Sequence, residues 1–214
     1  EGDHLLEAKL TSGSDEIILA LKSGKAIRFN ESKTRPMGRN ASGVRGIRLG
    51  HDKDAVVGMI TIPDIESANV LVVSENGYGK RSDIDDYRVT NRGGKGVKTI
   101  TITEKTGDLI AIKNVTDEDD LMIINKSGIV IRLGVDTLRV MGRATQGVKL
   151  INLKGSDQIA AVAKIEKTDD EDVEDAVVLD EEGNPIVNTE ENESHNDDSS
   201  NESEDGKDVD NTEE

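Results

Sequence analysis

Runs of consecutive aliphatic residues, each followed by a glycine turn, recur three times along the chain. After each run come a short polar stretch, a glycine and, four residues later, an arginine. The three sets are residues 17–21 with Gly24 and Arg28, residues 70–73 with Gly77 and Arg81, and residues 121–124 with Gly128 and Arg132. An apolar run that ends in Ser-Gly or Asn-Gly and then resumes predicts a β-hairpin whose turn needs positive φ. Because the runs are apolar at successive positions, these strands should be covered on both faces.

A second motif, R-x-x-x-G-V-[RK]-x-I, follows each hairpin, and its glycine lies nineteen residues after the hairpin glycine in all three copies. Its three copies begin at Arg39, Arg92 and Arg143 and contain Gly43, Gly96 and Gly147. We expect a third strand after each of these glycines and a fourth at residues 55–60, 109–112 and 159–163, with residues 5–8 opening the series. Four short strands in roughly 50 residues make one propeller-like blade. The prediction is an all-β fold with blades at about 5–54, 55–107 and 108–166.

Charge divides the chain into two parts. The sequence has 27 Lys and Arg against 44 Asp and Glu, a formal net charge of −17. Residues 169–214 contain only one of those cations but 21 of the acids, so residues 1–168 hold 26 cations against 23 acids. Such an acidic segment buries too little apolar surface to offset the entropy of ordering. We therefore expect a body at 1–168 and a disordered acidic tail at 169–214, with a weak strand pair at 176–187 as the only reservation.

Several classes of protein are disfavoured. No apolar stretch approaches the roughly 18 residues needed to cross a bilayer, and the start lacks a signal-peptide pattern. The absence of cysteine is compatible with a reducing compartment. The three histidines make no ligand set, and the acids at 117–120 lack calcium-loop spacing, so we expect no metal site. Because the chain begins without Met, we expect it to be a piece of a longer, cytoplasmic protein.

The repeats resemble the C-terminal domain of the DNA gyrase A subunit and, less closely, that of the topoisomerase IV A subunit. The likeness covers about residues 1–166 and is carried by residues 24–29, 35–40, 43–50, 76–81 and 142–148. It implies a β-pinwheel, a disc of four-stranded blades with a basic edge that carries bent double-stranded DNA. It also implies an A2B2 assembly on the bacterial chromosome. The partners in this assembly are the rest of the gyrase A polypeptide and the ATPase-bearing gyrase B polypeptide. ATP and Mg²⁺ are then used outside this chain.

One stretch matches the family's wrapping motif, Q-[RK]-R-G-G-K-G, incompletely. Residues 92–96 reproduce its last five positions, but Thr90 and Asn91 replace the first two. Since the family has this motif in its first blade, we interpret residues 92–96 as the equivalent loop of a later blade. The resemblance also places the DNA-cleaving tyrosine in an earlier domain. Tyr78 occupies a hairpin position that Lys25 and Ile129 occupy in the other repeats, so it is not that tyrosine. The resemblance places the ATPase on another subunit, and we therefore expect neither DNA cleavage nor ATP hydrolysis in this chain.

The candidate DNA contacts are the basic residues that recur in the loops, because regularly spaced like charges suit a track of phosphates. The loop candidates are Arg39, Arg45, Arg48, Arg92, Lys95, Lys98, Arg143 and Lys149, and the hairpin candidates are Lys25, Arg28, Lys80, Arg81 and Arg132. For the three hairpin arginines an equal alternative is a bond to neighbouring carbonyl groups. We expect the glycines to be structural.

Three functions remain open. The first is a non-catalytic DNA-wrapping module that supports ATP-dependent negative supercoiling. The second is the topoisomerase IV equivalent, which selects DNA crossings for decatenation. The third is a propeller scaffold that binds acidic proteins. The acidic tail could compete with DNA for the basic edge or simply keep the protein soluble.

Overall fold

The computed structural model describes residues 4–63 and 68–167; the predicted tail and its weak strand pair lie outside the described residues. Three antiparallel sheets follow one another along the chain, so the all-β prediction is confirmed. The first contains β1 (Glu16–Leu21), β2 (Lys25–Asn30), β3 (Val56–Ile62) and β6 (Val97–Lys98). The second contains β4 (Asn69–Ser74), β5 (Tyr78–Asp83), β7 (Leu109–Val115) and β10 (Val148–Lys149), and the third β8 (Asp119–Asn125), β9 (Val130–Gly134) and β11 (Ile159–Glu166).

The three hairpins lie where the turn glycines predict them. β1 pairs with β2, β4 with β5, and β8 with β9, and each turn glycine has positive φ, from +77° to +90°. A single-turn 3-10 helix follows each hairpin: η1 (Glu31–Lys33), η2 (Ile84–Asp86) and η3 (Val135–Thr137). The repeat in sequence is therefore a repeat in structure.

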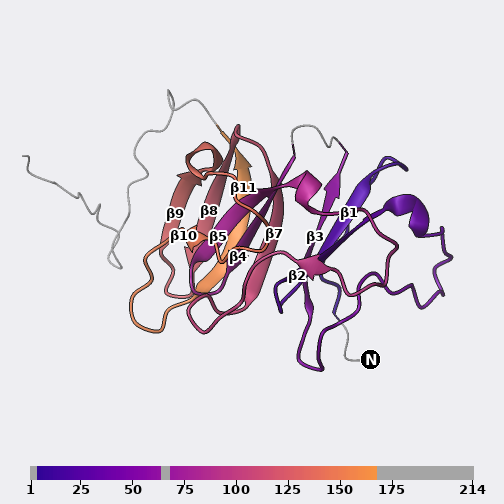
Figure 1. Ribbon diagram of the computed structural model, residues 1–214, viewed down its shortest axis with the longest axis horizontal. Coiled ribbons are helices and arrows are strands. Elements are labelled where there is room, and N and C mark those ends of the chain that lie inside the picture. The colour runs from indigo at the N-terminus through magenta and orange to yellow at the C-terminus, as the bar shows by residue number, and fades with distance from the viewer. Residues whose placement is uncertain (1–3, 64–67, 168–214) are drawn as a thin grey trace, which may run out of the picture. The chain divides into compact units, whose positions relative to one another are not determined.

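The unbroken aliphatic runs are explained by packing on both faces of the central sheet. In β4, Val70 and Val72 belong to the core shared with the first sheet, whereas Leu71 and Val73 belong to the core shared with the third. All four are fully buried. Figure 1 shows β1 and β3 at one end of the described unit, β8 and β9 at the other, and β4, β5 and β7 between them. Because successive strand residues point to opposite faces, only a doubly covered strand needs apolar residues at every position.

The outer strand of the first and of the second sheet comes from the next repeat, which differs from the prediction that four consecutive strands form one blade. β6 pairs with β2, and β10 pairs with β5. Periodicity in the sequence locates such two-residue strands but does not specify their partner. The third sheet has three strands in the described part of the chain, and the Val44 segment forms no strand there.

Residues 5–8 are not a strand, which corrects the prediction for the start of the chain. Leu5 and Leu6 are exposed. A hydrogen bond from the Met59 backbone N–H to the Glu7 carboxylate, at 3.3 Å, links this stretch to the first sheet. Leu5 and Leu6 cover no apolar surface, so this short stretch does not form a strand.

Candidate nucleic-acid interface

Three basic loops contain the second sequence motif, and we call them rim loops 1, 2 and 3: residues 35–48, 88–101 and 139–152. They contain four, four and three Lys or Arg residues respectively, and no Asp or Glu. That gives eleven cations without an acid in 42 residues of a protein that is acidic as a whole. The loops themselves contain no carboxylate, and Asp86 of η2 accepts from the Arg143 N–H at 3.1 Å, so most of their positive potential is available to an external anion.

Rim loops 2 and 3 are each fixed at both ends to the outer edge of the preceding hairpin. In rim loop 2, Val89 forms a parallel bridge with Arg28, and β6 pairs antiparallel with the start of β2. In rim loop 3, Val140 bridges Arg81 in the same way, and β10 pairs with the start of β5. Each loop is thus a short, doubly anchored arch along the edge of a sheet.

Close backbone approach explains the glycine at the end of each arch. Gly96 and Gly147 have φ of +70° and +82°, a conformation that disfavours other residues. A Cβ at Gly147 would lie 2.5 Å from the carbonyl oxygen of Gly79, and one at Gly96 would collide with the carbonyl of Ala26. These glycines are therefore structural, as the sequence predicts.

Successive rim loops are hydrogen-bonded to one another. The Arg48 N–H donates to Gly94 O at 2.8 Å, and the N–H of its repeat equivalent, Thr101, donates to Thr145 O at 3.1 Å. Arg92 Nη1 donates to Arg45 O at 3.0 Å, and Arg143 Nη1 to Lys98 O at 2.8 Å. The same two bonds join loop 1 to loop 2 and loop 2 to loop 3, so the three cationic segments lie side by side in order.

Six predicted loop contacts are exposed on these arches, and two others are engaged in holding the arches together. The exposed residues are Arg39, Arg45, Arg48, Lys95, Lys98 and Lys149. Arg92 and Arg143 are partly buried and donate to the carbonyl groups of the preceding loop. Lys25 is partly buried beside the strand pairing of β2 and β6.

The hairpin arginines favour the carbonyl-binding alternative. Arg28, 6% exposed, pairs with Glu16 and donates to Ile84 O and Tyr87 O at 2.8 and 2.9 Å. Arg81 pairs with Asp117 and donates to Leu138 O. Arg132 is more open, with 34% of its side chain exposed, and pairs with Asp120 at 2.6 Å. Two of these three therefore fasten one repeat to the next.

Lys80 is incompatible with its predicted role as a DNA contact. It is 1% exposed, and its Nζ donates to Gly142 O at 2.7 Å and to Ser82 Oγ at 3.1 Å. Burial lowers the pKa of Lys80 to about 8, although Asp86 acts in the opposite direction. Burial also raises the pKa of nearby Tyr87 to about 12, and its hydroxyl lies 2.5 Å from Thr99 Oγ1. The sequence suggests an exposed Lys80 because β5 has the pattern of a polar strand.

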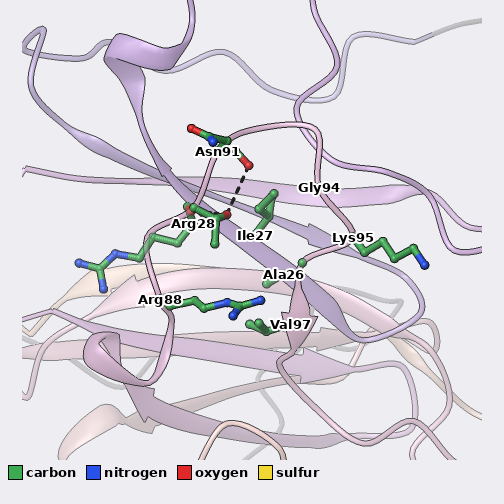
Figure 2. A pocket seen from close by; sticks show the side chains of 10 residues that line it. Ala26, Ile27, Arg28, Arg88, Asn91, Gly94, Lys95 and Val97 are labelled. Atoms are coloured by element: carbon green, nitrogen blue, oxygen red, sulfur yellow. Dashed lines mark hydrogen bonds between the residues drawn. The ribbon is translucent and has the colours of Figure 1, made fainter.

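A cavity of about 190 Å³ lies between rim loop 2 and β2. Its lining includes Arg88, Thr90, Asn91 and Lys95 together with the backbone of Gly94 and Gly96. Figure 2 shows the Arg88 side chain running along the cavity on the side of Val97, while the Lys95 ammonium points outward from the loop and the Arg28 guanidinium lies apart.

The sequence prediction missed one set of arginines, those that open each rim loop. Arg35, Arg88 and Arg139 each stand eight residues before the repeated glycine, and all three are exposed. The signal that would have found them is the same fixed offset that identified Arg39, Arg92 and Arg143. Their guanidinium groups form no hydrogen bond or ion pair with another described residue.

The stacked sheets and their hydrogen-bonded basic loops define a propeller-like repeat domain with a cationic edge. A family model for the DNA gyrase C-terminal domain, a β-propeller, matches residues 15–63, 68–116 and 119–166. The chain belongs to this family, so the predicted resemblance is confirmed, as is its homology to part of a type II topoisomerase.

Full-length relatives and solved structures agree with this assignment. The chain is 48% identical over 179 residues to the DNA gyrase A subunit of Staphylococcus aureus strain MRSA252, and 47% over 191 residues to that of strain NCTC 8325. These matches cover 82% and 87% of this chain but 20% of each relative, so the chain spans about a fifth of their length.

Among solved structures, a DNA gyrase A C-terminal domain matches with a TM-score of 0.64 and 26% identity, over 71% of this chain and 50% of that one. A topoisomerase IV C-terminal domain matches with 0.69 and 22%, over 74% and 49%, which shows the fold alone. The gyrase relation is thus supported by sequence, whereas the topoisomerase IV relation rests on the fold.

Among the described residues, no helix is long and apolar enough to cross a membrane.

Proposed function

We propose that this chain is a non-catalytic DNA-binding and DNA-wrapping module of a gyrase A-type polypeptide, which supports ATP-dependent negative supercoiling. The observation that carries the proposal is the row of three rim loops, which are joined in order and contain eleven cations without an acid. Bending a few tens of base pairs costs on the order of several kcal/mol, which many phosphate contacts spread over adjacent repeats can offset.

The proposed contacts are the exposed loop cations described above, to which Lys25 and Arg132 contribute from the hairpins. Lys80, Arg28 and Arg81 are left out because they are buried and engaged with carbonyl or carboxylate groups. Recognition would be independent of sequence, because phosphates carry no base information. Base stacking would add little, because Phe29 and Tyr87 are buried and Tyr78 is the one remaining aromatic residue of the described body.

The remaining proposals concern the whole enzyme. The partners would be double-stranded DNA, the rest of the gyrase A polypeptide and the ATPase-bearing gyrase B polypeptide in an A2B2 complex in the bacterial cytoplasm, on the chromosome. ATP and Mg²⁺ would act in parts of the enzyme outside this chain. Residues 1–168 would form the DNA-binding body, and the acidic segment 169–214 would either compete with DNA or keep the protein soluble. The identity of 47–48% to gyrase polypeptides favours this assignment over a decatenating topoisomerase IV.

The test is binding of the full 214-residue chain to a fluorescent duplex of about 40 base pairs at increasing salt. Phosphate neutralisation makes log K fall linearly with log salt, with a slope of about −0.9 for each contact. The triple variant Lys95→Gln, Lys98→Gln, Lys149→Gln should reduce the slope by about 2.7. Its matched control, Lys9→Gln, Lys53→Gln, Lys126→Gln, removes three exposed charges outside the rim loops and should leave the slope nearly unchanged. Equal effects of both triples, or a wild-type slope near zero, would contradict the proposal.

A further inference from the structure

We propose that the arginines at two repeated positions of the rim loops have different tasks. Arg35, Arg88 and Arg139, eight residues before the repeated glycine, would be the phosphate-contacting arginines. Arg92 and Arg143, four residues before it, would be positioning residues that hold consecutive loops in line. The inference rests on the proposed function and deepens it, because it names the DNA contacts that the sequence motif overlooks.

The arginines at these two positions differ in the hydrogen bonds that their side chains make. Arg92 donates from Nε to Lys33 O at 2.9 Å and from Nη1 to Arg45 O at 3.0 Å, so two of its guanidinium nitrogens are engaged. Arg143 donates from Nη1 to Lys98 O at 2.8 Å. Arg88 and Arg139 have no such partner among the described residues and are exposed. A guanidinium without an internal partner keeps its whole donor fork for a phosphate, which it binds through two parallel hydrogen bonds.

The backbone beneath the exposed arginines is held by the buried hairpin arginines. Arg28 Nη1 donates to the carbonyl oxygen of Tyr87, the residue immediately before Arg88. Arg81 Nε donates to the carbonyl oxygen of Leu138, the residue immediately before Arg139. The same contact therefore fixes the base of two successive exposed arginines. Such anchoring reduces the backbone entropy that is lost when the loop is ordered on DNA.

The buried residues that precede Arg88 and Arg139 direct these arginines outward. Tyr87 is fully buried and Leu138 nearly so, whereas the following arginine and valine are exposed in both loops. Beyond the arginine, Val89 and Val140 form the parallel bridges to the preceding hairpin. Arg88 and Arg139 consequently project from a backbone that is fixed on both sides of them.

The cavity beside Arg88 is large enough for a phosphate group. Its volume of about 190 Å³ is roughly that of six liquid waters. Arg88 runs along this cavity, whereas the Lys95 ammonium points outward from the same loop, so a phosphate in the cavity would meet the Arg88 side chain (Figure 2). The nearest acids in sequence are Asp85 and Asp86 of η2, and Asp86 Oδ2 already accepts from the Arg143 N–H at 3.1 Å.

The experiment compares two sets of substitutions in the full chain, by duplex binding over a salt series and by thermal unfolding. The triple variant Arg35→Gln, Arg88→Gln, Arg139→Gln should reduce the salt slope by about 2.7 and leave Tm within about 2 °C of wild type. The conservative triple Arg→Lys at the same positions should keep most of the slope, because a phosphate accepts either charge.

The second set is Arg92→Lys with Arg143→Lys. This variant retains both charges but loses the guanidinium donors that bind the carbonyl groups of Lys33, Arg45 and Lys98, so it should lower Tm by at least about 4 °C and reduce affinity at every salt concentration, with less than about one unit of change in slope. The inference fails if the Arg35, Arg88, Arg139 glutamine triple leaves a steep wild-type slope intact, while the proposed function stands. If the wild-type slope itself is near zero, the proposed function fails first.

Discussion

Arg143 donates a hydrogen bond from Nη1 to the carbonyl oxygen of Lys98 at 2.8 Å, and this bond joins rim loop 3 to rim loop 2. Its counterpart joins rim loop 2 to rim loop 1. A repeat domain is stabilised by interfaces between neighbours, and here that interface extends to the basic loops themselves. Successive cations are consequently held at a regular spacing, which a phosphate track requires.

The first prediction concerns this link. Arg143→Ala should lower the free energy of unfolding by about 1 to 2 kcal/mol, because a partly buried hydrogen bond from a charged group is lost. Arg139→Ala removes the same charge four residues earlier, from a side chain with no described partner, and should change it by less than about 0.5 kcal/mol. Urea unfolding followed by circular dichroism measures both. Equal losses would show that the two arginines do not differ in structural role.

The second prediction concerns the buried side chain of Arg28, which joins the first repeat to the second. Arg28→Met should destabilise the domain by about 3 to 5 kcal/mol, because Glu16 and two carbonyl groups lose their partner in a buried site. Arg45→Met, on the exposed surface of rim loop 1, is the control and should be close to neutral. A small effect at Arg28 would mean that water replaces the guanidinium there.

The sequence predicts the fold well because its strongest signals are local. The hairpins follow from apolar runs broken by Ser-Gly or Asn-Gly, and burial of both faces follows from β4, which has four aliphatic residues in succession. The partner of a two-residue strand is not a local property. β6 joins the first sheet because Gly96 lets the backbone approach Ala26, and no pattern within one repeat specifies that contact.

The basic edge is predictable only in outline. The repeat locates the loops, but it does not distinguish a cation that faces solvent from one that binds a carbonyl group. Lys80 and Lys95 are both predicted contacts, yet only Lys95 is exposed. The difference arises because Gly142, 62 residues further along the chain, provides a carbonyl oxygen for Lys80. Such long-range partners become visible only in the folded structure.

The third prediction separates backbone strain from close approach. Gly147→Ala should cost several kcal/mol and disrupt the β5–β10 pairing, because the residue has φ of +82° and its Cβ would lie 2.5 Å from Gly79 O. Gly43→Ala, at φ of +79° with open space around it, should cost only about 1 kcal/mol from the backbone conformation. Hydrogen exchange of the Val148 and Lys149 amides, with thermal unfolding, measures both effects. Similar costs would imply that the third rim loop can move away from β5.

The fourth prediction is a loss of stability in acid through Asp54. Burial pushes the pKa of this carboxyl upward, but hydrogen bonds from the Gly50 and Ser23 N–H groups and the Ser23 hydroxyl outweigh it and hold the pKa below its ordinary value. A lowered folded-state pKa adds stability above the unfolded-state value near 4, and this contribution is lost as pH falls through the folded value. Asp54→Asn should cost about 1 to 3 kcal/mol at pH 7 and much less at pH 2 to 3. An equal cost at both pH values would contradict the linkage.

The fifth prediction is an alkaline stability maximum from the buried Lys80 and Tyr87. Burial lowers the pKa of Lys80 to about 8, so between pH 8 and the unfolded value near 10.4 the unfolded chain binds more protons and the free energy of unfolding rises with pH. Burial raises the pKa of Tyr87 to about 12, so above about pH 10 the unfolded chain releases a proton that the folded chain retains, and the free energy of unfolding falls.

Urea unfolding from pH 7 to 11 should therefore show stability increasing to about pH 10 and then decreasing. Lys80→Met removes the group that titrates on the rising limb, so its curve should be flat between pH 8 and 10, although its baseline also reflects the lost bond to Gly142 O. Tyr87→Phe should retain the rise and weaken the fall. If the rise persists in Lys80→Met, another group titrates between pH 8 and 10. Burial then does not lower the pKa of Lys80 to about 8.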